Sequence, residues 1–94
     1  MDARELVAWN VRRLRVARGV PQDALAVDAG IDRTYVSRVE RNMENPTVAV
    51  LERLAHALDV EITELFAVPR ANAPRPDVLP KGRKSSAPRK RGRG

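Results

Sequence analysis

The stretch that most constrains this chain is residues 22–41, QDALAVDAGIDRTYVSRVER, which has the pattern of two short helices joined by a tight turn. Leu25 marks the apolar side of the first helix, and Val36 and Val39, three positions apart, mark that of the second. Gly30 adopts a positive φ without steric cost, so it predicts a sharp end for the first helix. The stretch therefore predicts a helix-turn-helix.

The second of these helices leaves a polar side uncovered, and Asp32 precedes it as the predicted N-cap. That side carries arginines and small hydroxyl residues, which suit base edges and phosphates: Arg33, Thr34, Ser37 and Arg38. Two helices around a glycine turn enter the DNA major groove in many proteins. The same pattern occurs in helical domains that bind no DNA, so the remaining sequence is needed to choose between the two interpretations.

The positive charge of the chain lies at its C-terminal end. Residues 1–68 hold nine arginines and eleven acidic residues, a net charge of −2, whereas residues 69–94 hold nine basic residues and one aspartate, a net charge of +8. A nearly neutral domain does not bind DNA by bulk charge, so binding would depend on individual arginines. The two compositions predict a domain over 1–68 and a tail over 69–94.

Hydrophobic spacing predicts an all-α domain with connections too short for a sheet. The expected helices cover residues 3–18, 22–29, 33–41, 48–58 and 62–67. Asn42 tolerates the left-handed conformation and is expected to end the third, and Thr47 is the expected N-cap of the fourth. The tail holds five prolines and only Val78 and Leu79 as sizeable apolar groups, so we expect it to be disordered.

Several classes of function are disfavoured by the sequence. It contains no cysteine and one histidine, His56, so a metal site or a cysteine-based catalytic site is not expected. No phosphate-binding glycine loop or Ser/His/Asp set is present, so we expect neither an enzyme nor a cofactor. No apolar run approaches the roughly 18 residues of a membrane span, and no signal peptide is evident. We expect a bacterial cytoplasmic protein, located at the nucleoid when bound to DNA.

Residues 11–66 resemble the Cro/C1-type (XRE) helix-turn-helix family of phage repressors and small bacterial regulators. The matching segments are VRRLRVARG, PQDALAVDAGID, RTYVSRVERN and NPTVAVLERLAHALDVEITELF. The resemblance implies a compact five-helix, lambda-repressor-like domain. It also implies a sequence-specific regulator of the repressor type, which binds double-stranded DNA as a homodimer.

The resemblance also implies residue roles. Base contacts are expected from Arg33, Thr34, Ser37 and Arg38, and backbone contacts from Gln22, Tyr35, Arg41, Thr47 and Val48. Tyr35 has two possible roles, because its ring either packs on the DNA or is wedged beside the helix of residues 22–29. Gln22 either contacts a phosphate or is solvated. Arg15 and Glu40 are expected to pair between the first and third helices, which would make Glu40 structural.

Three positions depart from the family pattern. Pro21 replaces the usual Ser or Thr cap, and Asn42 stands where Gly often follows the recognition helix. Met43 and Glu44 place an acid in a loop that often supplies basic phosphate contacts. The domain alone is therefore expected to bind DNA with modest affinity.

The basic tail is the expected compensation. Six of its side chains are predicted to contact phosphates: Arg83, Lys84, Arg89, Lys90, Arg91 and Arg93. Deleting residues 69–94 would then flatten the salt dependence of binding and leave the preferred site unchanged. The alternative is a solvated linker or a solubilising tail without a role in binding.

The sequence leaves the partners open. Ile62, Leu65 and Phe66 are candidate dimer contacts, unless the small core needs them all. One alternative function is an antitoxin-type regulator that binds a partner protein, such as a toxin; RNA polymerase is another possible partner. A second alternative is a non-specific nucleic-acid binder that acts through the tail, with RNA as a possible target.

Overall fold

The computed structural model describes residues 1–73. Four α-helices and one 3-10 helix follow one another, and this part of the chain contains no strand: α1 (Ala3–Ala17), α2 (Gln22–Ala29), α3 (Arg33–Glu40), α4 (Val48–Ala57) and η1 (Ile62–Phe66). The all-α prediction is therefore confirmed for residues 1–73. The predicted count of five helices is not confirmed, because the fifth segment, η1, is a short 3-10 helix that ends where Ala67 becomes extended. The predicted tail is residues 69–94, and its part from residue 74 onward lies outside the described residues.

Side-chain caps begin α1, α3 and α4, whereas α2 starts after Pro21 without one. Asp32 accepts a hydrogen bond from the Thr34 amide at 2.8 Å, and Thr47 caps α4 by accepting one from the Val50 amide at 3.1 Å, as predicted. A capping box was not foreseen at α1, where the Asp2 carboxylate accepts from the Glu5 amide and the Glu5 carboxylate accepts from the Asp2 amide. These bonds satisfy amides that a helix start leaves unpaired.

A left-handed residue follows each of the four α-helices. Gly30 has φ 70° after α2, and Asn42 has φ 58° directly after the turn that closes α3. Both were expected to take this conformation. Three helices end one residue earlier than predicted, because Arg18, Arg41 and Leu58 act as C-caps.

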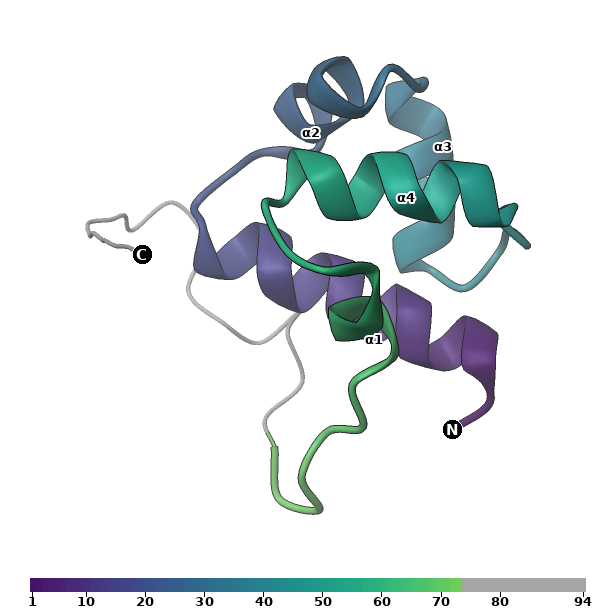
Figure 1. Ribbon diagram of the computed structural model, residues 1–94, viewed down its shortest axis with the longest axis vertical. Helices are drawn as coiled ribbons and strands as arrows, with labels where there is room; N and C mark the ends of the chain where they lie inside the picture. The colour runs from purple at the N-terminus through teal and green to yellow at the C-terminus, as the bar shows by residue number, and fades with distance from the viewer. Residues whose placement is uncertain (74–94) are drawn as a thin grey trace.

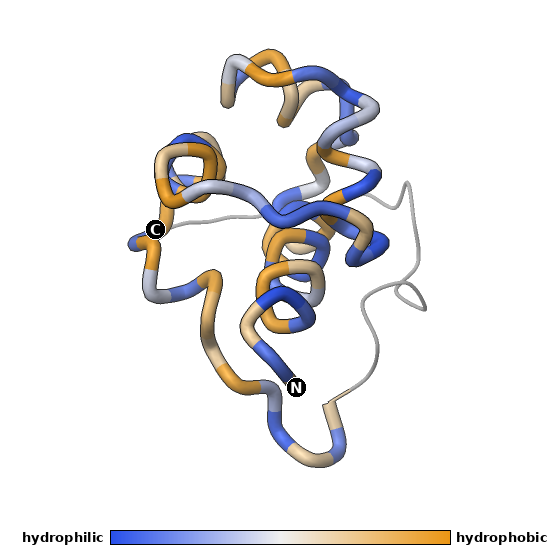
Figure 2. Tube along the Cα trace, turned by 90° about the vertical axis from the view of Figure 1, so that its right-hand side faces the viewer, coloured by the Kyte–Doolittle hydropathy of each residue, from blue (hydrophilic) through white to orange (hydrophobic). Residues whose placement is uncertain are grey.

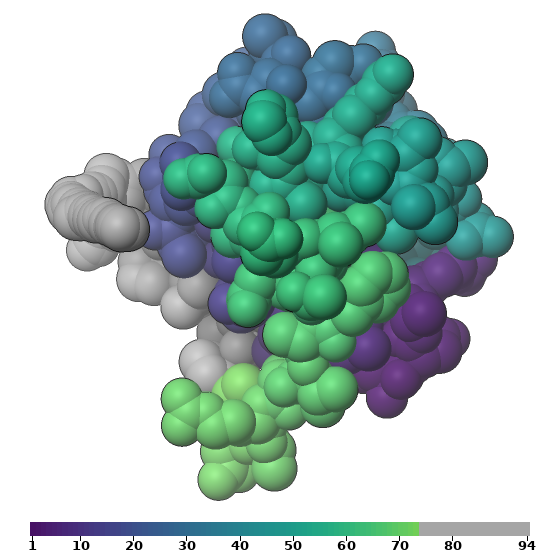
Figure 3. Space-filling view, viewed as in Figure 1, coloured from purple at the N-terminus to yellow at the C-terminus, as the bar shows by residue number. Residues whose placement is uncertain are grey.

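The helices enclose one small core. α3 packs between α1 and α2, while α4 packs on α2 and η1, and η1 returns to α1. In Figure 1 α4 crosses in front of α3 and above α1. Hydrophobic and hydrophilic residues alternate along the helical parts of the chain trace (Figure 2). The fully buried side chains come from every element: Val11, Leu25, Val36, Leu54, Leu58 and Leu65. In the space-filling view α4 lies at the front, and α3 is largely behind it (Figure 3).

The 3-10 helix is fixed to α1 by a buried asparagine. Asn10 is 1% exposed, and its Nδ2 donates to the carbonyls of Leu65 at 3.1 Å and Ala67 at 2.8 Å. Leu65 is fully buried, which contradicts its candidacy as a dimer contact: the core takes it, because η1 turns this side chain towards α1 and α4. Phe66 remains 38% exposed and Ile62 is half-buried.

None of the helices between residues 1 and 73 combines the length and the apolar composition that a membrane crossing needs.

Candidate nucleic-acid interface

The outer side of α3 carries the predicted base-reading residues. Val36 and Val39 are buried, and the start of the helix presents Arg33 and Thr34 to solvent. The Asp32 cap fixes this first turn. Ser37 and Arg38, one turn further on, are half-buried. The four residues lie within two turns of one helix, which is the length that fits into a major groove.

Arg38 is held by the loop that follows α3. Its Nε donates to Glu44 Oε2 at 2.7 Å, and its Nη2 donates to the carbonyl of Met43 at 3.2 Å. A backbone hydrogen bond joins the same two residues: the Met43 amide donates to the Arg38 carbonyl at 2.8 Å. The sequence identified Glu44 as an unusual acid but gave no sign of its partner.

Tyr35 is half-buried and packs against the hydrophobic core. Burial raises the pKa of its hydroxyl above the ordinary value, and the Glu44 carboxylate raises it further. Tyr35 is therefore a neutral hydrogen-bonding group at physiological pH. Both roles expected of this ring, contact with DNA and a place beside α2, stay predictions.

A buried carboxylate ties α3 to α1 and α2. The Glu40 side chain is fully buried and accepts two hydrogen bonds from Arg15, with Arg15 Nη2 at 2.9 Å from Glu40 Oε1. Arg12 Nε and Gln22 Nε2 donate to the same oxygen at 3.1 Å each. Arg15 also donates to the Val20 carbonyl at 3.0 Å. The geometry thus contains the expected Arg15–Glu40 pair and adds Arg12 and Gln22 to it; we call these four side chains the Glu40 cluster.

The other expected backbone contacts lie at the starts of α2 and α4 and at the end of α3. Gln22 opens α2, half-buried and bonded to Glu40. Arg41 follows α3 and is exposed, with Nε donating to the Ser37 carbonyl at 3.4 Å. Thr47 and Val48 are exposed at the start of α4, where helix amides point outward. The six predicted tail residues, from Arg83 to Arg93, lie outside the described residues.

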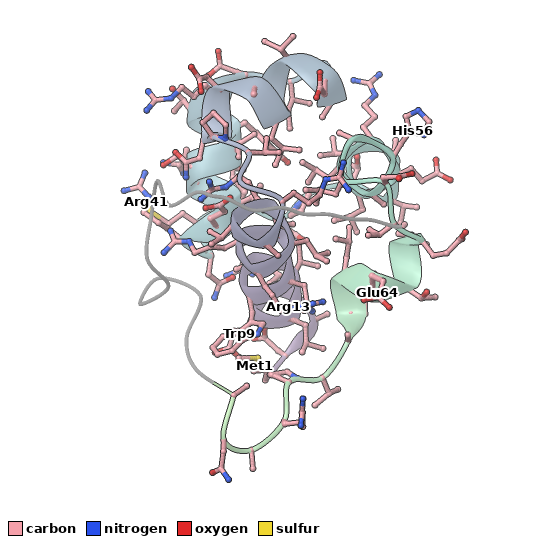
Figure 4. All side chains as sticks on the ribbon, turned by 90° about the vertical axis from the view of Figure 1, so that its left-hand side faces the viewer. Met1, Trp9, Arg13, Arg41, His56 and Glu64 are labelled. Carbon is pink, nitrogen blue, oxygen red and sulfur yellow. The ribbon has the colours of Figure 1, made fainter. Side chains whose placement is uncertain are left out.

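The described part of the chain shows no candidate metal site. His56 is exposed on α4, on the side of the molecule opposite Arg41 (Figure 4). Within residues 1–73, histidine and acidic side chains nowhere gather in a group of three or more suited to a metal ion. The arginine-rich surface around α3 is thus the best-developed candidate site.

Comparison with known proteins gives a consistent result. The helix-turn-helix family model matches residues 11–65. A hypothetical transcription factor from Neisseria meningitidis serogroup B is 42% identical over 69 residues, which cover 73% of this chain and 65% of that protein. The restriction-modification controller protein C.AhdI from Aeromonas hydrophila has a crystal structure with a TM-score of 0.65 and 41% identity, covering 67% of this chain and 96% of that one.

A second controller protein, C.Esp1396I, has been solved as a tetramer in complex with its natural 35-base-pair operator. It has a TM-score of 0.65 and 32% identity over 70% of this chain and 87% of that one. Other structures of C.Esp1396I carry single substitutions of an arginine, a threonine and a tyrosine at three consecutive positions. The same order of residues occurs here at Arg33, Thr34 and Tyr35.

Proposed function

The chain belongs to the helix-turn-helix family of the XRE type, and we propose that it is a sequence-specific DNA-binding transcriptional regulator of the repressor type. The observation that carries the proposal is the division of α3 into two sides. Val36 and Val39 face the core, and Arg33 and Thr34 point to solvent at the start of the helix. The operator complex of C.Esp1396I supports the same use of the fold.

In this proposal α3 enters the major groove and its neighbours hold the phosphates. Guanidinium and hydroxyl groups donate hydrogen bonds to acceptor atoms on base edges. The proposed base contacts are therefore Arg33, Thr34, Ser37 and Arg38. Gln22, Tyr35, Arg41, Thr47 and Val48 contact the sugar-phosphate backbone on either side. Such contacts set the position and register of the protein on the duplex.

The regulator is proposed to bind as a homodimer on a two-fold symmetric operator, with half-sites about one helical turn apart. The tetrameric C.Esp1396I complex supports assembly on DNA in a relative. Exposed Phe66 and Val68, at and beyond the end of η1, are the apolar groups on which we expect the dimer to form. Leu65 is excluded from this surface by its burial.

The basic residues of the tail are proposed to add sequence-independent affinity. The folded part has a net charge close to zero, whereas residues 69–94 carry the excess positive charge of the chain. Each phosphate that a tail residue neutralises steepens the salt dependence of binding, by about 0.9 in the logarithmic slope. Removal of residues 69–94 is therefore expected to flatten this slope and to leave the preferred sequence unchanged; a changed preference would contradict the division of roles.

The central test is a triple substitution in α3. Binding is measured by fluorescence anisotropy on the duplex upstream of the protein's own gene, with excess random duplex as competitor. R33A/T34A/R38A is expected to lose about 100-fold or more in operator affinity, because each good base contact discriminates by about 1–3 kcal/mol. The control is R4A/R53A, which removes two exposed arginines outside α3. Equal losses in both variants, or none in the first, would refute the proposal.

A further inference from the structure

We propose that Glu44 is a specificity-determining residue: it holds the Arg38 guanidinium for a guanine and withholds it from phosphates. The inference rests on the proposed function, because it assigns a role to a side chain beside the base-reading surface of α3. Glu44 itself contacts no base in this proposal. It acts as a positioning residue for Arg38.

The geometry of the guanidinium carries the argument. Arg38 uses Nε for Glu44 and one N–H of Nη2 for the Met43 carbonyl. Both bonds lie on the same edge of the planar group, and Nη1 takes part in neither. The remaining edge, formed by Nη1 and the second N–H of Nη2, offers two parallel donors. Two parallel donors are what the O6 and N7 acceptors of guanine require.

The loop that supplies these acceptors is itself attached to α3. The Met43 amide donates to the Arg38 carbonyl at 2.8 Å, so the loop is bonded to both the backbone and the side chain of Arg38. The side chains of Arg38 and Glu44 are 39% and 28% exposed. The pair therefore lies at the surface, open to a nucleic acid, yet its geometry is set before any DNA arrives.

Charge adds a second effect. A guanidinium without a partner is attracted to any phosphate, since phosphate accepts hydrogen bonds from many directions and at every nucleotide. A carboxylate 2.7 Å away competes for that charge and repels nearby phosphates. The Glu44 charge also reaches Tyr35, whose pKa it helps to raise. Two side chains of α3 thus experience the same carboxylate.

The test uses selection from a library of duplexes with randomised central positions, followed by affinity measurements on the enriched and on random duplexes. Four full-length proteins are compared: wild type, R38Q, E44Q and E64Q. R38Q identifies the base pair that depends on Arg38. E64Q is the matched control, because Glu64 also pairs with an arginine, Arg13, at 3.5 Å, on the side of the molecule away from Arg41 (Figure 4). Thermal unfolding establishes that each variant is folded.

For E44Q we expect the discrimination at the Arg38-dependent base pair to fall by about tenfold, which is within the range of one arginine–guanine pair. Affinity for random duplex is expected to rise, with a salt slope steeper by about 0.9 if Arg38 takes up one phosphate. E64Q is expected to match wild type in sequence preference. E44Q with wild-type preference and wild-type affinity for random duplex would overturn the role of Glu44 alone. A wild-type protein that enriches no sequence would overturn the proposed function, and the role of Glu44 with it.

Discussion

Two carboxylates bind arginines at or near α3, one inside the protein and one at its surface. Inside, the fully buried Glu40 accepts from Arg12, Arg15 and Gln22. At the surface, Glu44 accepts from Arg38 alone, and both side chains remain partly exposed. An arginine–carboxylate contact therefore has a different role when it is buried than when water reaches it.

Burial explains the difference. A carboxylate removed from water must have its oxygens satisfied, and the Glu40 cluster does so with donors from two other helices. Those donors fix the angle at which α3 lies on α1 and α2. A surface ion pair contributes little to stability, because water and salt screen it. The Arg38–Glu44 contact can therefore be removed without loss of the fold.

The largest effect is expected from Glu40→Ala. The substitution leaves Arg12 and Arg15 without their carboxylate. Loss of one partner of a buried pair costs about 3–5 kcal/mol, and we expect the lower end because both arginines reach solvent in part. In a domain of this size the melting temperature should then fall by more than about 10 °C.

Circular dichroism during heating measures this loss, and DNA binding at the same temperature should weaken with it. Glu52→Ala, which removes the same charge from the exposed side of α4, is the control and should stay within about 0.5 kcal/mol of wild type. An unchanged melting temperature for Glu40→Ala would show that the buried cluster does not hold α3.

Gln22→Ala tests a residue that belongs to the buried Glu40 cluster and also to the proposed DNA-binding surface. Its amide bonds to Glu40 inside the protein, and the proposed function assigns it a phosphate outside. We expect a loss of about 1 kcal/mol in the free energy of unfolding, since Arg12 and Arg15 still satisfy Glu40. DNA affinity should fall for operator and random duplexes alike, because phosphate contacts carry no sequence information. A loss restricted to the operator would assign Gln22 to base reading instead.

Glu44→Gln is expected to change stability least among these substitutions, by about 0–1 kcal/mol. The amide retains an acceptor for Arg38 and leaves no buried charge behind. Thermal unfolding of this variant beside Glu40→Ala directly compares the buried carboxylate of α3 with the surface carboxylate of the loop that follows it. A loss as large as that of Glu40→Ala would mean that the surface pair is part of the scaffold, and the contrast between the regions would disappear.

Local signals made much of the fold predictable. Gly30, Asp32, Asn42 and Thr47 end or begin helices as expected, because turns and caps depend on neighbours in the sequence. The bond from Asn10 to Leu65 and Ala67 spans more than fifty positions, and no local pattern encodes it. The apolar residues near 62–67 predicted a short helix there, and its 3-10 form was not predicted.

The candidate site shows the same limit. The positions of Arg33 and Thr34 on the outside of α3 follow from the spacing of Val36 and Val39. The ion-pair partners of the charged residues cannot be predicted from this spacing, because each arginine could reach several acidic side chains. No sequence pattern predicted that Arg12 and Gln22 bind Glu40. The contact between Arg38 and Glu44 depends on the path of the loop after α3, which only the structure shows.

The smallest effect concerns Tyr35, which reports on the surface pair without DNA. It is the single tyrosine of the chain, so tyrosinate absorbance during an alkaline titration follows this residue alone. Burial and then Glu44 raise its pKa, so the folded protein should ionise above the ordinary value near 10. A raised folded pKa implies stability that is present below pH 10 and is lost as the pH rises through the folded pKa. Glu44→Gln should lower this pKa only in part, since burial remains, and Glu64→Gln should leave it unchanged. A full return to the ordinary value in Glu44→Gln would mean that the ring is held in place by the Arg38–Glu44 contact, and that the surface pair orders more of α3 than one guanidinium.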